Sequence, residues 1–349
     1  MSGTGIRNAR SEFAKMTWAL SAVSYPILLF VFCLATGCTQ PPAASSSTSH
    51  STETASASEP TLPPSMVSIP APSFDAQRAW QYTKEVTAFG PRPVGSANHK
   101  KIEQYILSHV KGDQVEDDDF VADTIEGKFP VHNIVAKFPG TRDGILVVAG
   151  HYDTNYPFRN NGYVGANDGG SSTAVLLEIA NQLRAKKREG YSVWLVWTDG
   201  EEAMREWTDT DSVYGARHLA EKWQKDGTIK SIKTFLLADM IGDADLNIDE
   251  DANSTPWLEE VVYQAATRLG VQSHFYARKL AVGDDHTPFL KLGVPCADLI
   301  DFDYGYNNVF WHTPQDTIDK LSPKSIEIAG SVILETIYML DMMNLPPKR

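Results

Sequence analysis

From residue 73 onwards, short apolar runs alternate with stretches in which apolar positions recur at helical spacing. The run Ile145-Leu146-Val147-Val148-Ala149 has no polar position, as a strand covered on both faces of a sheet requires. Similar runs of strand length make five predicted strands, at 131–138, 144–149, 192–197, 234–238 and 296–300.

Amphipathic stretches lie between these runs and predict helices at 75–88, 99–110, 171–186, 214–223, 257–269 and 323–343. The first two are separated by the turn-rich segment 90–96. This order of elements predicts an α/β fold with three layers, α/β/α, around a central mixed and mostly parallel sheet.

The first 72 residues have a different pattern. Basic residues up to Lys15 precede an apolar stretch that ends at Cys38, so 1–38 is expected to be a signal sequence or membrane anchor. Small residues before Cys38 favour a lipoprotein signal, although the stretch also reaches the ~18–20 residues of a transmembrane helix. The Ser-, Thr- and Pro-rich segment 39–72 is expected to be a disordered linker, and 73–349 the catalytic domain.

The chain has 349 residues and a formal net charge of -13, which argues against nucleic acid as a partner. Two of its three cysteines, Cys33 and Cys38, lie in the N-terminal segment. Cys296 remains, in an apolar run, and is expected to be a buried small side chain rather than a nucleophile. We expect an exported domain outside the cytoplasm, attached to the cell envelope only through its N-terminal segment.

Residues that can bind a metal follow the predicted strands. In open α/β sheets ligands bind at the carboxyl ends of the strands. His151, the segment 199–202, Asp239 and His312 each follow a strand, and Asp168 precedes the helix at 171–186. Their convergence predicts a functional site at this edge of the sheet.

A catalytic zinc ion needs three protein ligands and one open position. Asp168, Glu202 and His312 would supply two carboxylates and one imidazole, and Glu201 would stay free to carry a proton. Each residue alone has a simpler interpretation: Asp168 as a helix cap, Glu201-Glu202 as a solvated pair and His312 as a structural histidine. Another histidine, His218, is expected to be structural. Five segments at one edge favour the metal site.

The motifs His151-Tyr152-Asp153, Asp199-Gly200-Glu201-Glu202 and Trp311-His312-Thr313 resemble those of zinc exopeptidases, a superfamily that includes di-zinc aminopeptidases and glutaminyl-peptide cyclotransferases. The segments 201–220 and 284–290 resemble the cyclotransferases in particular. The resemblance runs from about residue 75 to the C-terminus.

The resemblance implies roles for individual residues. One zinc ion would be bound by Asp168, Glu202 and His312. Glu201 would be the proton shuttle, with Asp239 and Asp284 as its hydrogen-bonded partners, while Trp207 and Trp311 would form walls of the glutamine pocket. The implied reaction closes N-terminal glutamine of peptides or proteins into pyroglutamate and releases ammonia.

Two alternatives stay open at this point. A di-zinc aminopeptidase would hold a second ion with His151 and Asp239, and Asp168 would bridge the two ions. A non-catalytic peptide-binding lipoprotein could use the same fold, although it could dispense with Glu201 and with several ligands, and none of them is missing.

Overall fold

The computed structural model describes residues 73–345. The signal segment and linker expected in 1–72 lie outside the described residues. No helix between residues 73 and 345 has the length and apolarity needed to cross a bilayer.

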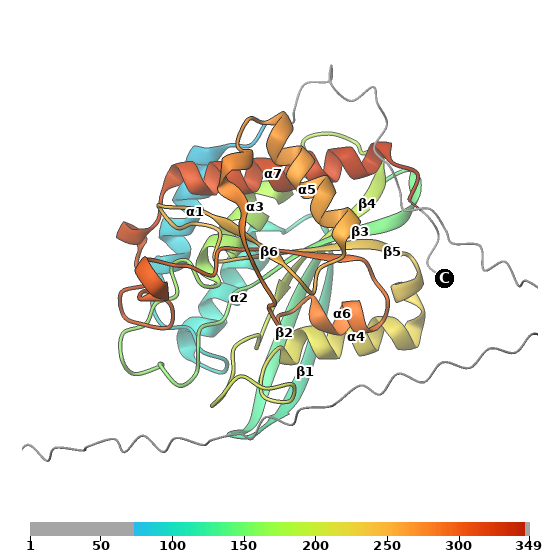
Figure 1. Ribbon diagram of the computed structural model, residues 1–349. Helices are drawn as coiled ribbons and strands as arrows, with labels where there is room; N and C mark the ends of the chain where they lie inside the picture. Colours follow the sequence, from blue (N-terminus) through green and yellow to red (C-terminus); the bar gives the residue numbers. More distant parts are fainter. Residues whose placement is uncertain (1–72, 346–349) are drawn as a thin grey trace, which may run out of the picture. The chain divides into compact units, whose positions relative to one another are not determined.

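A six-stranded mixed sheet forms the centre of the domain (Figure 1). Its strands, in the spatial order β1-β2-β4-β3-β5-β8, are β1 (Gln114–Thr124), β2 (Gly127–Phe138), β4 (Tyr191–Thr198), β3 (Arg142–His151), β5 (Ile232–Asp239) and β8 (Cys296–Ile300). From β4 to β8 all neighbours are parallel, whereas β1 and β2 are antiparallel additions at one side. A separate parallel pair is formed by β6 (Ile248–Asp251) and β7 (Phe275–Leu280). The predicted mixed, mostly parallel sheet is confirmed.

Seven α-helices in the described range cover the sheet: α1 (Ala76–Ala88), α2 (Ala97–His109), α3 (Gly170–Arg184), α4 (Tyr214–Asp226), α5 (Pro256–Arg268), α6 (Thr287–Lys291) and α7 (Pro323–Met342). Several begin at side-chain caps. Asp75 accepts a hydrogen bond from the backbone N–H of Arg78, and Ser96 accepts one from that of His99. Such caps satisfy backbone donors that have no partner inside the helix.

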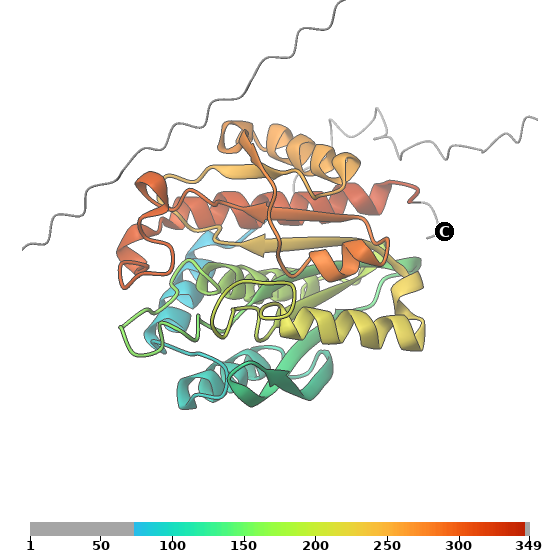
Figure 2. The ribbon, with the colours of Figure 1, turned by 60° about the horizontal axis from the view of Figure 1, so that its bottom comes forward.

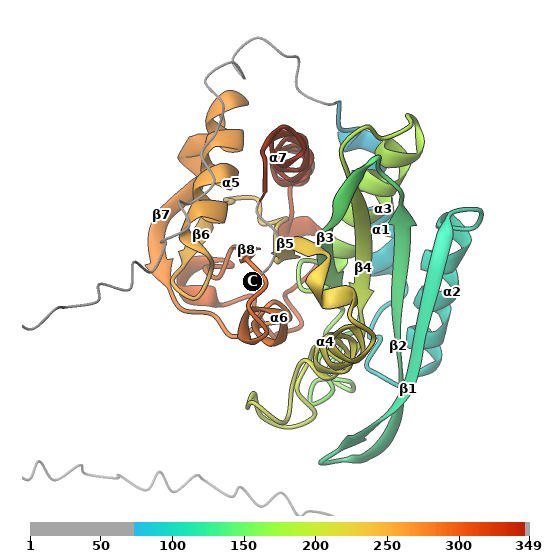
Figure 3. The same cartoon turned by 90° about the vertical axis from the view of Figure 1, so that its right-hand side faces the viewer.

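Alternating side chains of the strands build two apolar cores. In β3, Leu146 and Val148 face a core that includes α1, α2, α3, α5 and α7, while Val147 and Ala149 face one that includes α4 and α6. Figure 3 shows α7 and α3 on one side of the central strands and α4 and α6 on the other. The three predicted layers follow from this burial on both faces.

The strand β1 is missing from the predicted set because its sequence is polar. It is an edge strand, in which Glu116 forms ion pairs with Lys137 of β2 and Lys222 of α4. Acidic residues on an exposed edge also hinder pairing with other chains.

Candidate metal centre and active site

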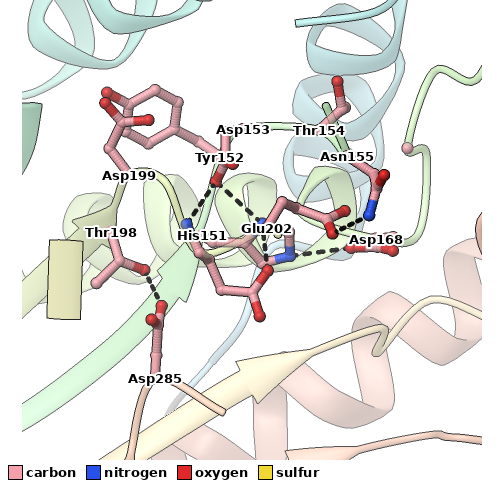
Figure 4. Close-up of polar contacts among 12 residues, drawn as sticks. His151, Tyr152, Asp153, Thr154, Asn155, Asp168, Thr198, Asp199, Glu202 and Asp285 are labelled. Atoms are coloured by element: carbon pink, nitrogen blue, oxygen red, sulfur yellow. Dashed lines mark hydrogen bonds and ion pairs between the residues drawn. The ribbon is translucent and has the colours of Figure 1, made fainter. Parts of the chain in front are cut away.

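The carboxyl ends of the parallel strands bring five segments to one edge of the sheet. Figure 2 shows the fold from a second side, and Figure 4 shows His151, Asp168 and Glu202 in close-up. His151 ends β3 and Asp239 ends β5. The segment 199–202 follows β4, and His312 lies in the loop after β8. Asp168 comes from the loop between β3 and α3. The convergence predicted from the strand ends is therefore present.

Asp168, Glu202 and His312 form the first group of ligand atoms. Nε2 of His312 lies 3.2 Å from Asp168 Oδ2 and 3.2 Å from Glu202 Oε2. Ligand atoms around a tetrahedral zinc ion are separated by ~3.3 Å, given zinc–ligand bonds of ~2.0–2.2 Å. The spacing of these atoms is thus close to that of a zinc coordination shell.

His151, Asp168 and Asp239 form a second group. His151 Nε2 lies 3.0 Å from Asp168 Oδ1 and 3.3 Å from Asp239 Oδ1. All three residues are buried. Asp168 belongs to both groups and offers a different oxygen to each, as the di-zinc alternative requires.

The charge at this edge favours a cation. Burial alone would lower the pKa of both imidazoles, but the surrounding carboxylates outweigh it. For His312, Glu202 and Asp168 raise the pKa to about 10. For His151, Glu201 and the neighbouring aspartates raise the pKa well above 6.5. Buried carboxylates that pull protons onto two imidazoles would equally stabilise a metal ion.

Several buried atoms suit a metal because nothing else binds them. Both ring nitrogens of His151, Oε1 of Glu202 and Oδ1 of Asp239 are buried and have no hydrogen-bond partner among residues 73–345. Such atoms are rare in folded proteins unless an ion or water binds them. Imidazole and carboxylate ligands with a remaining open position fit zinc, so the residues present match a catalytic zinc site.

Neighbouring residues hold the ligands in place. Asn155 donates a hydrogen bond of 2.7 Å from Nδ2 to Glu202 Oε2 (Figure 4). The Tyr163 hydroxyl donates one of 2.6 Å to Asp168 Oδ2. A Cβ at Gly169, where φ is +73°, would lie 2.8 Å from His151 Cε1. The glycine after Asp168 thus lets the loop pass against His151.

Glu201 lies beside the ligands and belongs to neither group. It is 4% exposed, and its Oε2 lies 3.7 Å from His151 Nδ1. Burial raises the pKa of the Glu201 carboxyl well above its ordinary value, His151 opposes this, and Asp284 adds to it. A buried carboxyl with a raised pKa beside a metal site can accept and return a proton near neutral pH.

Asp284 and Asp285 add two more buried carboxyls behind Glu201. Burial, and then Asp239 and Asp285, raise the pKa of Asp284 well above its ordinary value. Burial raises the pKa of Asp285 to about 7, although Thr198 donates a hydrogen bond to it (Figure 4). Among residues 73–345 the structure records no hydrogen bond from Glu201 to Asp239 or Asp284. Asp284 acts on Glu201 through its charge.

A cavity of about 430 Å³ opens onto the ligands. Trp207, 43% exposed, and Trp311 both line it, and the Trp311 ring stacks on His312 at 4.0 Å between centroids. Much of the remaining lining is apolar: Pro157, Phe158, Leu280, Val282, Ile300 and Phe302. Both tryptophans therefore line this cavity, and their role as walls of a glutamine pocket stays a prediction.

The backbone is strained at three positions around the site. Val213, Met240 and His312 have φ of 44°, 47° and 54°, in the left-handed region that L-residues rarely adopt. Met240 follows Asp239, and His312 is itself a candidate ligand. Strain of this kind gathers at functional sites, where the surrounding structure enforces it.

A third buried group, Asp251, His286 and Asp298, has a different geometry. His286 Nε2 lies 3.3 Å from Asp251, whereas its other ring nitrogen, Nδ1, lies 3.7 Å from Asp298. One ligand atom from each of the three residues still lies within 4.8 Å of the others, and none of the three residues lines the cavity.

His218 and Cys296, both expected to have structural roles, pack against other residues of the fold, away from the cavity. His218 Nδ1 lies 3.0 Å from Asp118 Oδ2, and its ring stacks on Phe120 with 3.8 Å between centroids. Cys296 is fully buried in β8. Neither lines the cavity.

Sequence reasoning did not single out Asn155, Tyr163 or Asp285. Asn155 and Asp285 lie next to motifs that were recognised, so a search of the flanking positions could have found them. Tyr163 carries no local signal, because only the folded loop brings its hydroxyl to Asp168.

The chain is similar to known proteins of one family. Residues 133–337 match the model described as "Peptidase family M28". A glutaminyl-peptide cyclotransferase of Drosophila melanogaster is 31% identical over 253 residues, which are 65% of this chain and 70% of that protein.

Two solved structures extend the comparison. The crystal structure of an Acidobacteriales bacterium glutaminyl cyclase is 48% identical, with a TM-score of 0.77, and the match covers 78% of this chain and 97% of that one. A zinc-dependent exopeptidase from Parabacteroides distasonis is 25% identical, with a TM-score of 0.69, over 77% of this chain and 99% of that one. The family model and these likenesses together show that the chain belongs to peptidase family M28 and, within it, to the glutaminyl-peptide cyclotransferases.

Proposed function

We propose that this chain converts N-terminal glutamine of peptides or proteins to pyroglutamate and releases ammonia, with one zinc ion bound by Asp168, Glu202 and His312. The observation that carries the proposal is the carboxyl of Glu201, which lines the same mostly apolar cavity as that ligand group and belongs to neither group of ligand atoms. The 48% identity to a bacterial glutaminyl cyclase supports it independently.

The substrate lies with its glutamine side chain in the cavity. Trp207 and Trp311 enclose the side chain and limit the access of water. A zinc ion in the first ligand group supplies Lewis-acid polarisation of the γ-carbonyl group. Holding the α-amine and the γ-carbon in one pocket makes ring closure a matter of orientation.

Glu201 moves the proton. Its carboxylate accepts a proton from the α-amine as the nitrogen–carbon bond of the ring forms, and its carboxyl then returns the proton to the leaving ammonia as the γ-carbon–nitrogen bond breaks. The buried surroundings that raise its pKa make the carboxylate a stronger base and so favour the first transfer. The charge of Asp284 also raises the pKa of the Glu201 carboxyl.

The number of zinc ions separates this proposal from the aminopeptidase alternative. His151, Asp168 and Asp239 offer a second set of ligand atoms. We expect this second site to stay without zinc. Burial raises the pKa of Asp239 and of Glu202 alike, so competition by protons does not separate the two sites, and zinc counting decides between them.

The proposal extends to location. The apolar segment that ends at Cys38 supports export and lipid attachment of the chain, with the domain outside the cytoplasm. A Cys38→Ser variant should lose membrane association in a fractionation experiment. Its continued presence in the membrane fraction would instead favour a transmembrane anchor.

Incubation of the purified protein with a glutamine-initiated peptide tests the function. We expect ammonia release and a product that has lost one ammonia, and no reaction of the same peptide with an acetylated α-amine. Leucine amide serves as the substrate of the alternative. Release of free leucine without cyclisation of the glutamine peptide would refute the proposal.

A further inference from the structure

Arg92 is a fully buried cation close to the metal site. It lies in the turn between α1 and α2 and has no exposed surface. Within residues 73–345 the structure records no ion pair for its guanidinium, and all its side-chain hydrogen bonds go to backbone carbonyl oxygens. They reach Tyr152 at 2.7 Å, Val164 at 2.5 Å, Gly165 at 2.8 Å and Asp168 at 3.3 Å.

These bonds connect the two ends of the loop that carries the shared ligand. Tyr152 directly follows His151 at the end of β3, whereas 164–168 is the segment that delivers Asp168. The fork of a guanidinium can reach several diverging acceptors at once, which an ammonium group cannot do in the same geometry. Arg92 therefore fixes the distance between the two ligand-bearing parts of the loop.

The same loop is held from its other side by Asp316. Its carboxylate accepts hydrogen bonds from the backbone N–H of Asn167, at 2.8 Å, and of Asp168, at 3.2 Å. Arg92 thus binds the carbonyl group of Asp168 while Asp316 binds its N–H group. The protein itself therefore binds the backbone of the shared ligand on both sides.

Burial of Arg92 is unfavourable and is offset by its surroundings. Desolvation lowers the pKa of its guanidinium, and Tyr163, Asp316, Asp153 and Asp168 oppose this through their charge. A neutral side chain at this position would avoid the cost of desolvation but would also leave several buried carbonyl groups without donors.

We propose that Arg92 is a positioning residue of the metal centre, which holds the Asp168 backbone so that one carboxylate oxygen faces His312 and the other faces His151. Those oxygens lie 3.2 Å and 3.0 Å from the two imidazoles, so a small shift of the loop would misplace Asp168 in both ligand groups. The inference rests on the metal site of the proposed function, but it does not depend on glutamine as the substrate.

Arg92→Lys and Arg92→Gln in the full chain test the role. Lysine keeps the charge and loses the fork, whereas glutamine loses both. Arg142→Gln is the matched control, because Arg142 also bonds a backbone carbonyl, that of Asp341, but at the opposite end of β3. Zinc affinity is measured by competition with a chromogenic chelator, the ligand geometry by the visible spectrum of the cobalt-substituted protein, and folding by circular dichroism of the metal-free protein.

We expect both Arg92 variants to fold without metal, to bind zinc about 10–100-fold more weakly and to change the cobalt spectrum, as is typical when a residue that orients a ligand is lost. Arg142→Gln should match the unmodified chain in all three readouts. Unchanged zinc affinity and an unchanged cobalt spectrum in both Arg92 variants would overturn the proposal. So would failure of both variants to fold, which would make Arg92 a residue of the fold as a whole. A chain that binds zinc but does not cyclise glutamine would refute the proposed function and leave this inference standing.

Discussion

At the scale of single residues, the site is a set of buried polar side chains, several of whose atoms lack a hydrogen-bond partner within residues 73–345. Within the described part of the chain, Oε1 of Glu202, Oδ1 of Asp239 and both nitrogens of His151 have no hydrogen-bond partner. Buried polar atoms without partners are costly, so a fold keeps them where a bound ion repays that cost. Glu201 differs from these groups because it is free to change its protonation.

The role of Glu201 is tested by Glu201→Gln, which removes the proton carrier and keeps the shape of the side chain. We expect one zinc ion to stay bound and the rate of cyclisation to fall by about 10²–10⁴-fold, the typical contribution of a general acid–base group. Asp209→Asn, on the same loop but exposed, is the control and should keep its activity. Near-normal turnover by Glu201→Gln would contradict the proton role.

A residue far from the metal gives a prediction for pH. Oε1 of Glu259 in α5 is buried without a hydrogen-bond partner, and burial, together with Glu250 and Asp251, raises its pKa from 4.5 to about 7. Below pH 4.5 the carboxyl is protonated whether the chain is folded or unfolded, so it has no effect on the pH dependence of stability. Between pH 4.5 and 7 the folded state binds more protons, so stability falls as the pH rises.

Glu259→Gln should therefore raise the free energy of unfolding by about 1–3 kcal/mol at pH 8 and change it little at pH 4. Denaturant unfolding at the two pH values measures this difference. Glu260→Gln, one residue further along α5 and exposed, should show no such pH dependence. An equal effect of Glu259→Gln at both pH values would disprove the linkage.

At the scale of elements, the site depends on how closely α4 packs against the loop that carries Glu201 and Glu202. A Cβ at Gly215, in the first turn of α4, would lie 2.2 Å from the carbonyl oxygen of Asp199 and 2.3 Å from Asn133 Oδ1. Only glycine allows this approach. The close contact fixes the start of segment 199–202 relative to the sheet.

Gly215→Ala should push this loop away and cost about 1–3 kcal/mol of stability, with a clear loss of zinc affinity. Gly270→Ala is the control: its φ is +71°, with no atom within 4 Å of the added Cβ, so it costs about 1 kcal/mol through backbone strain alone. Chelator competition on both variants would decide the matter, and equal zinc affinities would contradict the role of the α4 contact.

The elements predicted from the sequence are those whose buried positions give a regular apolar pattern. Five buried strands and the long amphipathic helices were found, and their ends placed Asp168, Glu202 and His312 at one edge. The polar edge strand β1, the strand β7 and the helix α6 have few buried positions, and β6, although three of its four residues are buried, is too short and too acidic to give a periodic signal. Arg92 could not be found either, because its acceptors are backbone carbonyl groups 60 to 76 residues away along the chain.

At the scale of the whole molecule, the chain is acidic, and several of its carboxylates gather in one cavity. The net charge is -13, and Asp168, Glu201, Glu202, Asp239 and Asp284 all line one cavity. Such a cavity attracts a metal cation and the protonated amine of a peptide. Its carboxylates come from several segments of the chain, so no single strand could form it. The match to peptidase family M28, from 133 to 337, includes all five of these carboxylates.

Titration of the metal-free protein with zinc, while ammonia release from a glutamine-initiated peptide is followed, tests the central claim most directly. The account predicts that cyclisation rises linearly and stops rising at one zinc ion per chain, and that His312→Ala abolishes this rise while His151→Ala keeps the one-ion endpoint. Activity that saturates only at two ions per chain, or that appears as release of leucine from leucine amide instead of ammonia, would contradict it.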